Sequence, residues 1–235
     1  MFLSIVIAIY NEQGNVKELT ERIYSSMDKL DVPFELIYVI DGKDQSFEII
    51  KEIQKTKSNL ILDHSPNLRG FKNAFVKGFQ LINPSATHIL TLDGDLNHRP
   101  EEIKNLLSAM EQKHADLVVG SRYTSGGQVK RLAFWKRAVS TFANFVIELL
   151  WKIKLKDKTS GYRLYKKEVI EKTVPLCTSG GFEFLFEIIL LSRRFNYKIN
   201  EVPIIFITRE HGESKFNLFR TISGYLGLMR KYFLK

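Results

Sequence analysis

Residues 88–98 read His-Ile-Leu-Thr-Leu-Asp-Gly-Asp-Leu-Asn-His, a short apolar run followed directly by acidic and amide side chains. Residues i and i+2 of a β-strand point to the same face, so Asp93 and Asp95 are expected to converge where this strand ends, with Asn97 one step further. Carboxylate and amide oxygens suit a hard cation such as Mg²⁺ or Mn²⁺. A solvated acidic turn would give the same short pattern, and the rest of the chain decides between the two interpretations.

The first half of the chain alternates short apolar runs with amphipathic segments. The runs predict strands at 3–10, 34–40, 59–63, 89–92 and 115–120, and the segments between them predict helices at 15–30, 45–55, 72–81 and 100–113. Strands and helices in alternation are typical of an α/β fold, in which a mostly parallel sheet carries helices on both faces. We therefore predict such a Rossmann-like sheet.

Polar side chains gather where these predicted strands end. The clusters are Tyr10-Asn-Glu12, Asp41, Asp93 with Asp95, and Ser121-Arg122. Parallel strands bring their carboxyl ends to one edge of the sheet, and α/β proteins bind their ligands beyond that edge. Four polar clusters at a single edge favour a cation site over a solvated acidic turn.

The composition limits the class of protein. The chain of 235 residues, 44% of them hydrophobic, is long enough for one sizeable α/β domain. Its single cysteine, Cys177, excludes an internal disulfide and suits a reducing compartment. No uncharged stretch has the roughly 18 apolar residues that a membrane span needs.

The net charge of +9 is unevenly distributed. Residues 1–121 hold 13 Lys and Arg against 17 Asp and Glu, whereas residues 122–235 hold 22 against 9. The second half is therefore expected to meet an anionic partner: a nucleic acid, a phosphate-bearing substrate or a membrane surface.

Two basic segments of this half have a helical apolar stripe. Within residues 130–156, apolar side chains recur in steps of three and four, at Leu132, Trp135, Val139, Phe142, Val146, Leu149 and Ile153. Residues 217–235 repeat the pattern with further Lys and Arg. Each stripe could pack on the sheet as core, but two basic amphipathic segments together favour a surface that faces a membrane.

The motifs together resemble those of family-2 glycosyltransferases with the GT-A fold, in particular the polyprenyl-phosphate sugar transferases that include dolichol-phosphate mannose synthases. The resemblance extends from about residue 3 to 216. The matching segments are Ile7-Ala-Ile-Tyr-Asn-Glu12, Val39-Ile-Asp41, Asp93-Gly-Asp-Leu-Asn-His98, Gly120-Ser-Arg-Tyr123, Thr159-Ser-Gly-Tyr-Arg-Leu-Tyr165, Gly181-Phe-Glu-Phe184 and Arg209-Glu-His-Gly-Glu-Ser-Lys215.

The resemblance implies an inverting transfer of one sugar from a nucleotide donor to a polyprenyl or dolichyl monophosphate. GDP-mannose is the leading donor, and a UDP-sugar such as UDP-glucose is the alternative. It also implies a GT-A domain over residues 1–216, an acceptor- and membrane-facing helical region at 130–156, and a basic C-terminal helix at 217–235. The protein is then expected at the cytoplasmic face of a membrane, held peripherally by itself or by a small membrane partner, with no nucleic acid.

The resemblance also implies roles for individual residues. The base and ribose contacts are Ala8, Tyr10, Glu12, Val39 and Asp41, and the further nucleotide contacts are Asp93 and Gly94. Asp95 and Asn97 would hold Mg²⁺ or Mn²⁺. Arg122, Arg209 and Lys215 would surround the phosphates, and with Asp95 they form the expected catalytic set. The acceptor phosphate is expected at Lys136, Arg137 and Ser140. We expect no general base, neither His98 nor His211, because a phosphate monoester with a pKa near 6 is already nucleophilic at pH 7.

Several positions depart from the pattern of that family. Ile40 replaces the first of two paired aspartates, Asn97 replaces a longer glutamine, and Lys136 replaces an arginine. Two other classes of function are weighed against the enzyme: a nucleic-acid-binding module, which leaves the acidic strand ends unexplained, and a non-catalytic scaffold of a membrane complex, which leaves the phosphate-binding motifs unexplained.

Overall fold

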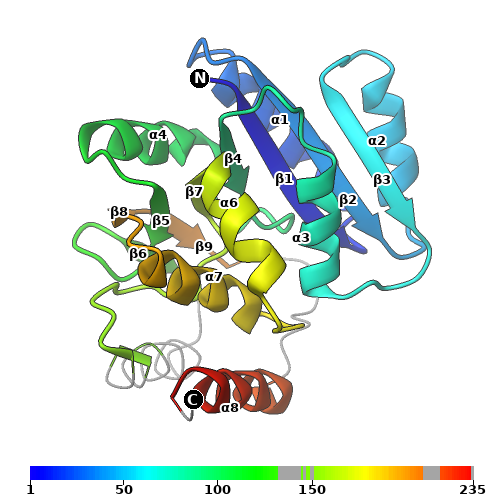
Figure 1. Cartoon of the computed structure of the whole chain (residues 1–235). Coiled ribbons are helices and arrows are strands. Elements are labelled where there is room, and N and C mark those ends of the chain that lie inside the picture. The colour runs from blue at the N-terminus through cyan, green and yellow to red at the C-terminus, as the bar shows by residue number, and fades with distance from the viewer. Residues whose placement is uncertain (132–143, 145–146, 149–150, 209–217, 234–235) are drawn as a thin grey trace.

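The computed structural model describes residues 1–131, 144, 147–148, 151–208 and 218–233 (Figure 1). Its centre is a seven-stranded sheet with the strand order β3-β2-β1-β4-β7-β5-β8. The strands are β1 (Leu3–Tyr10), β2 (Phe34–Asp41), β3 (Leu60–Ser65), β4 (His88–Thr91), β5 (Leu117–Ser121), β7 (Arg163–Lys166) and β8 (Ile199–Pro203). Every neighbouring pair is parallel except the pairs that β7 forms with β4 and β5. A small parallel sheet joins β6 (Gln128–Lys130) to β9 (Ile205–Ile207).

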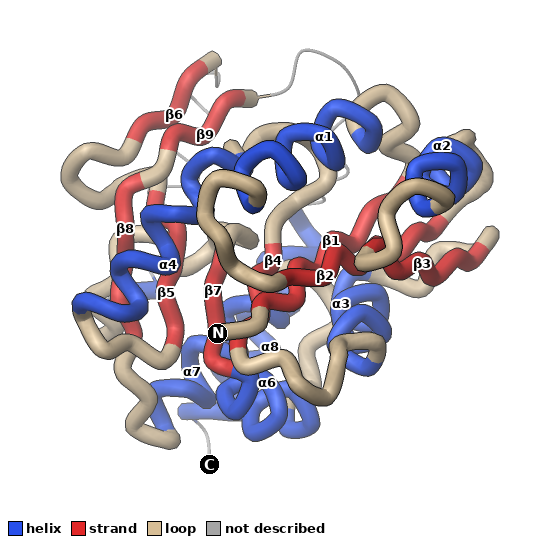
Figure 2. The backbone as a smooth tube through the Cα atoms, turned by 90° about the horizontal axis from the view of Figure 1, so that it is seen from above, coloured by secondary structure: helices blue, strands red, loops and turns tan. Residues whose placement is uncertain are grey.

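Helices cover both faces of the large sheet (Figure 2). One face packs against α1 (Val16–Met27), α2 (Ser46–Gln54) and α4 (Ile103–Gln112), the last preceded by the 3₁₀ turn η1 (Pro100–Glu102). The other face packs against α3 (Phe71–Gln80), α6 (Lys167–Thr173), α7 (Glu183–Arg194) and α8 (Leu218–Phe233), and the 3₁₀ turn η2 (Val174–Leu176) follows α6. The predicted α/β architecture is therefore confirmed.

The apolar character of the strands follows from this double covering. In β1, Ile5, Ile7 and Ile9 belong to the core beneath α1, whereas Val6 belongs to the core beneath α3. Successive side chains point to opposite faces, and both faces are dry, so the strand sequence is a continuous apolar run rather than an alternating one.

Strand β7 was not predicted. It runs antiparallel between β4 and β5, with Leu164 opposite both Leu90 and Val118. The sequence predicted β4 and β5 as successive strands of the first half and gave no strand order. A short segment from the second half separates them, and pairing of this kind depends on contacts that are distant in sequence.

The predicted helix at 130–156 is wrong at both ends. Lys130 belongs to strand β6, where it pairs with Ile207 of β9, and Lys152 has a φ of +51°, after which residues 152–155 are not helical. Ile147 and Ile153 are buried in the core that α7 and α8 share, so these positions of the stripe are core. The stripe residues within 132–143, together with Val146 and Leu149, lie outside the described part of the chain.

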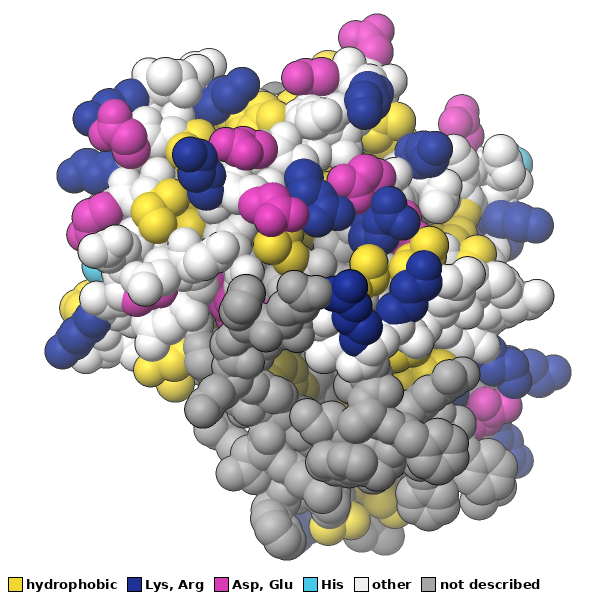
Figure 3. Space-filling model, turned by 180° about the vertical axis from the view of Figure 1, so that it is seen from behind, with side chains coloured by type: hydrophobic (Ala, Val, Ile, Leu, Met, Phe, Trp, Pro, Cys, Tyr) yellow, Lys and Arg dark blue, Asp and Glu magenta, His cyan; other side chains and the backbone are white. Residues whose placement is uncertain are grey.

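The C-terminal helix is confirmed as α8. Leu228 is buried and packs with α7, whereas Leu226 is 57% exposed. Among the helices that the structure describes, none is both long and apolar enough to cross a bilayer. On the face shown in Figure 3, Lys and Arg side chains stand beside Asp and Glu side chains, so the described part of that face carries mixed charge.

The contact between α3 and the sheet leaves no room for a side chain at Gly78. A Cβ there would lie 2.3 Å from Cγ1 of Val6, which is a stiff β-branched residue. We predict that Gly78→Ala lowers the free energy of unfolding by about 1–3 kcal/mol in urea denaturation, because the extra methyl overpacks the core. The matched control is Gly227→Ala in α8, where nothing lies within 4 Å of an added Cβ. That variant should lose no stability. Equal stability of the two variants would contradict the close contact.

Candidate active site

The turn that carries the acidic pair lies across the end of β1. The register places Tyr10 beside Asp41, at the carboxyl ends of β1 and β2. A Cβ on Gly94 would lie 2.2 Å from Cγ2 of Ile9, so the backbone between Asp93 and Asp95 passes directly over β1. A residue with a side chain at position 94 could not make this approach. These polar residues therefore lie together at one edge of the sheet, as the sequence predicts.

Asp93 is held by groups on both sides of its carboxylate. His98 Nδ1 lies 3.3 Å from Asp93 Oδ2, and a Cβ on Gly161 would lie 2.7 Å from Asp93 Oδ1. The imidazole of His98 packs between the rings of Tyr162 and Phe206, with centroid distances of 5.2 and 5.3 Å. Burial lowers the pKa of His98 to about 4, so the ring is neutral at pH 7. A buried neutral ring beside Asp93 fits a structural role better than that of a general base.

Asp95 is fixed by its neighbour Asn97. The backbone N–H of Asn97 donates to Asp95 Oδ1 at 3.2 Å, and its Nδ2 donates to Asp95 Oδ2 at 2.6 Å. In this arrangement the amide supports the carboxylate, and only the amide oxygen would be a metal ligand. Leu96, between them, has a φ of +61°, which folds the turn back on itself.

The oxygen atoms of this turn fit a hard divalent ion. Among the described residues, no group of three His, Cys, Asp or Glu side chains converges as a complete metal site. An ion held by Asp95, with Asp93 beside it, would take its other ligands from water and from a phosphate-bearing substrate. Mg²⁺ is commonly bound in this way, through one or two carboxylates and substrate phosphate.

Arg122 is a cation at the same edge. It follows β5, and its Nε and Nη2 donate to the two carboxylate oxygens of Asp157 at 2.7 and 2.9 Å. Nη2 also donates to Thr159 Oγ1 at 2.7 Å. The guanidinium lies over the ring of Phe206, 5.1 Å from its centroid, and Phe206 also contacts His98. One aromatic ring therefore links the arginine to the acidic turn.

The ion pair of the largely buried Arg122 with the fully buried Asp157 has shifted pKa values. Burial by itself would raise the pKa of Asp157, but the charge and hydrogen bonds of Arg122 outweigh it and lower that pKa to about 2. The same pairing overcomes the effect of burial on Arg122 and raises its pKa. Both groups are therefore charged at neutral pH. The bidentate contact occupies Nε and Nη2 and directs Nη1 away from Asp157.

Asp41, at the end of β2, is 2% exposed and is bonded to Arg69. The sequence analysis missed both Arg69 and Asp157. Arg69 follows β3 directly before Gly70, so the rule that ligands meet the carboxyl ends of strands could have found it. Asp157 stands two residues before the Thr159–Tyr165 motif, which marks the segment but not the pairing with Arg122.

The other predicted site residues fall into three groups. Tyr10 and Ala8 are partly exposed at the edge, and Glu12 accepts a bond of 2.7 Å from Asn15 Nδ2. Val39 is fully buried in the core beneath α3, so its side chain is not at an open surface. Arg209, Lys215, Lys136, Arg137 and Ser140 lie outside the described residues.

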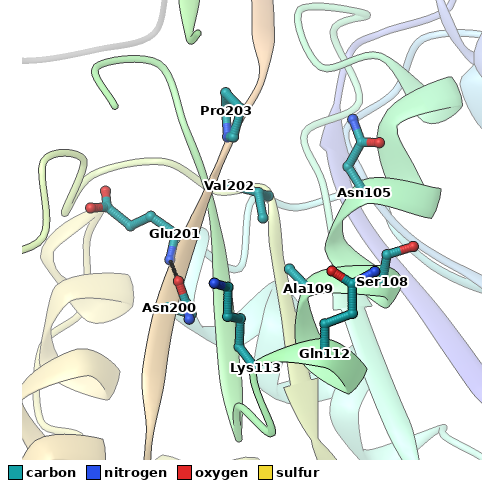
Figure 4. A pocket seen from close by; sticks show the side chains of 9 residues that line it. All are labelled: Asn105, Ser108, Ala109, Gln112, Lys113, Asn200, Glu201, Val202 and Pro203. Atoms are coloured by element: carbon teal, nitrogen blue, oxygen red, sulfur yellow. Dashed lines mark hydrogen bonds between the residues drawn. The ribbon is translucent and has the colours of Figure 1, made fainter. Parts of the chain in front are cut away.

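A groove of about 390 Å³ lies between α4 and β8, and Asn105, Gln112, Lys113 and Asn200 are among its lining residues (Figure 4). Glu201 also lines this groove, but none of the candidate site residues discussed above does. The acidic and basic side chains of the candidate site lie at the carboxyl ends of the strands instead.

The sequence of the chain matches the family described as Glycosyl transferase family 2 over residues 4–174. The chain belongs to glycosyl transferase family 2. It is 33% identical to a dolichol-phosphate mannosyltransferase of Pyrococcus furiosus over 231 residues, which cover 96% of this chain and 62% of that protein. It is 30% identical to a polyprenol monophosphomannose synthase of Mycolicibacterium smegmatis, with 91% and 80% covered. The chain thus spans about three fifths of the length of the Pyrococcus relative.

Solved structures show that this family-2 chain has the GT-A fold. Mannosyl-3-phosphoglycerate synthase from Rubrobacter xylanophilus superposes with a TM-score of 0.73 at 12% identity, covering 98% of this chain and 74% of the other. Glucosyl-3-phosphoglycerate synthase from Mycobacterium tuberculosis, in complex with Mn²⁺, uridine diphosphate and glucosyl-3-phosphoglycerate, gives 0.69 at 16% identity, with 97% and 79% covered. At these identities the likeness concerns the fold alone.

Asp157 is expected to stabilise this family-2 fold above acidic pH. Its pKa in the folded state, about 2, lies below the unfolded value of about 4, so its contribution is complete above pH 4 and is lost as the pH falls toward 2. We predict that Asp157→Asn lowers the free energy of unfolding at pH 7 by about 3 kcal/mol, because Arg122 stays buried without its carboxylate. Urea titrations from pH 6 to pH 2.5 should show the difference between variant and wild type shrinking. A difference that is independent of pH would contradict the ion pair.

Proposed function

We propose that this protein transfers one sugar, with inversion, from a nucleotide-sugar to the phosphate of a polyprenyl or dolichyl monophosphate. The observation that carries the proposal is the meeting of the acidic turn and Arg122 at one sheet edge, where His98 of that turn and Arg122 both contact the ring of Phe206. The names of the relatives support the acceptor, because at 30–33% identity they are transferases of dolichol phosphate and of polyprenol monophosphate.

The chemistry of the edge suits departure of a nucleoside diphosphate. Negative charge grows on the diphosphate as the bond to the sugar breaks, and preplaced cations stabilise this charge more in the transition state than in the ground state. Asp95, with Asp93 and Asn97 beside it, would hold Mg²⁺ or Mn²⁺, which acts as a Lewis acid on the diphosphate when bound. Arg122 contributes a fixed guanidinium. In the proposal, Arg209 and Lys215 supply further positive charge.

The acceptor needs no general base. A phosphate monoester is largely a dianion at pH 7 and attacks the sugar as it is. His98 is buried against Asp93, which supports leaving it out of the chemical step. Lys136, Arg137 and Ser140 are proposed to receive the acceptor phosphate.

GDP-mannose is the proposed donor. The mannosyl transfer in the names of two relatives supports it. An undecaprenyl-phosphate transferase of another sugar, from Edwardsiella ictaluri, is 30% identical as well, which supports a donor that carries a different sugar. A UDP-sugar is the second candidate. Ala8, Tyr10, Glu12 and Asp41 are proposed to contact the base and ribose.

We further propose a peripheral position at the cytoplasmic face of a membrane, with residues 1–216 as the GT-A domain and 217–235 as a helix against it. Leu226 of α8 is 57% exposed, and the basic Arg230, one turn further along the helix, is also exposed. An apolar and a basic side chain side by side suit a lipid interface. Leu228 on the other side of the helix is core. A small membrane partner would strengthen the same attachment.

The decisive experiment is a donor screen with the whole chain. GDP-mannose, UDP-glucose and other labelled nucleotide-sugars are each incubated with Mn²⁺ and a polyprenyl phosphate in detergent, and the label is followed into the organic phase. In parallel, nucleoside diphosphates with Mn²⁺ should raise the melting temperature, because ligands of the native state stabilise it by mass action. Transfer from GDP-mannose that EDTA abolishes is the expected result. Absence of transfer and of any thermal shift would overturn the proposal.

Asp95 is the residue whose removal should be most damaging. We predict that Asp95→Asn lowers kcat by roughly 100-fold or more, because the transition state loses its metal-bound stabilisation, while the melting temperature stays close to that of the wild type. The matched control is Asp31→Asn, an exposed carboxylate in the turn after α1 whose positive φ asparagine tolerates. Undiminished turnover of Asp95→Asn would exclude the metal role of this residue.

Lys136 and Arg137 should govern use of the lipid. We predict that Lys136→Glu with Arg137→Glu weakens association with anionic vesicles by at least roughly tenfold, since each basic residue near such a surface contributes about 1 kcal/mol. The KM for lipid phosphate should rise as well. The matched control reverses two exposed lysines, Lys51 of α2 and Lys55 directly after it, as Lys51→Glu with Lys55→Glu. An equal effect of the two pairs would mean that only net charge matters.

A further inference from the structure

Arg69 forms a fixed clamp on the last residue of β2. Its backbone N–H donates to Asp41 Oδ2 at 2.7 Å, and its Nε donates to Asp41 Oδ1 at 2.6 Å. Nη2 donates to the carbonyl of Ile40 at 3.2 Å, and Nη1 forms a close ion pair with Asp63. One side chain therefore holds the main chain and the carboxylate at the end of the same strand.

The clamp itself is held in place by its surroundings. The carbonyl of Arg69 accepts a bond of 2.9 Å from Asn73 Nδ2 in the first turn of α3. Gly70, next in the chain, has a φ of +91°, and this left-handed residue turns the chain from Arg69 into the helix. Both the backbone and the side chain of Arg69 are therefore determined by the fold rather than by solvent.

The charges around Arg69 balance. Asp63 pairs with Arg69 and lies 3.5 Å from Lys77 Nζ, so two cations face the two carboxylates of Asp41 and Asp63. Asp41 is 2% exposed, whereas the Arg69 side chain is 23% exposed. A buried carboxylate without a cation would be costly. Asp63 can be balanced by Lys77, but the cation that contacts Asp41 is Arg69.

The contacts with Arg69 also determine the directions in which the Asp41 carboxylate can accept further hydrogen bonds. A carboxylate has about four acceptor positions, and Arg69 occupies one on each oxygen, which stops the group from rotating. Asp41 pairs in register with Tyr10, at the carboxyl ends of β1 and β2, where the nucleoside is proposed to bind. The remaining acceptor positions of Asp41 keep one orientation, as recognition of a base or ribose donor requires.

We infer that Arg69 is a positioning residue for the nucleoside of the donor: it acts through Asp41 and sets donor affinity without contacting the diphosphate or the metal. The inference rests on the proposed function, because it needs Asp41 to bind the nucleoside. Its consequence is a separation of effects. Loss of Arg69 weakens binding of the nucleoside part and leaves the pyrophosphate part and the chemical step nearly unchanged.

The test compares Arg69→Gln with Lys77→Gln, which removes the other cation of the cluster from a residue that does not contact Asp41. The readouts are the KM of the donor, kcat, and dissociation constants of GDP, UDP and inorganic pyrophosphate, each with Mn²⁺, measured by calorimetry on the whole chain. We expect Arg69→Gln to raise the donor KM and the dissociation constant of the preferred nucleoside diphosphate by roughly tenfold or more. Pyrophosphate affinity and kcat should stay within about threefold, which is the range of ordinary surface substitutions. Lys77→Gln should behave as the wild type.

A conservative variant keeps the test sharp should Arg69→Gln fold poorly. Arg69→Lys retains the charge but not the two-sided contact, so its donor KM should lie between those of the wild type and Arg69→Gln, with an unchanged melting temperature. Equal affinity of the wild type and both variants for nucleoside diphosphates would overturn this inference alone, as would an equal loss of pyrophosphate and nucleotide affinity. A wild type that binds no nucleoside diphosphate would overturn the proposed function and this inference with it.

Discussion

The geometry of the site depends on the turn at residues 157–162, which leads into strand β7 between β4 and β5. Asp157 holds Arg122, Gly161 lies against Asp93, and Tyr162 packs on His98. Thr91 of β4 donates to the carbonyl of Gly161 at 2.8 Å. The turn before the antiparallel strand thus carries the contacts that join the acidic turn after β4 to the arginine after β5.

A buried arginine holds this turn in position. Arg163 is fully buried, and its Nε and Nη2 donate to the carbonyls of Ser160 and Lys158 at 2.7 and 2.9 Å, while Nη1 donates to the carbonyl of Leu185 in α7. Burying a charge is unfavourable unless its hydrogen-bond donors are satisfied. Three carbonyl oxygens satisfy it, and together they tie the turn before β7 to α7. The position of the site therefore depends on the packing of the second half of the chain.

Each charged or acidic group at the edge has a partner from another part of the chain or from its own turn. Arg69 holds Asp41, His98 holds Asp93, Asn97 holds Asp95, and Asp157 holds Arg122. Such partners set the direction of a functional group before the ligand arrives, so little reorganisation remains for the reaction itself. The same principle operates at α8, where Lys231 reaches the fully buried Glu187 at 2.7 Å and holds the C-terminal helix on α7.

The amino-acid sequence by itself determined the parallel α/β half and the gathering of Tyr10, Asp41, Asp93 and Asp95 at its edge. These features follow from local periodicity and from the rule that parallel strands end together. Local patterns also place a basic amphipathic helix at the C-terminus, which the structure describes as Leu218–Phe233. They do not show where a helix stops, and Lys130 proved to be part of a strand.

Only the tertiary structure decided the insertion of β7 and the partners of the site residues. The partners of Asp41 and Arg122 are 28 and 35 positions away in sequence, and no repeat or spacing relates them. Ion pairs and strand pairings of this kind form because folding brings distant side chains into a low-dielectric interior, where an unpaired charge is too unfavourable to persist. The chemical groups of the site can therefore be read from the chain, whereas their orientation is a property of the packed molecule.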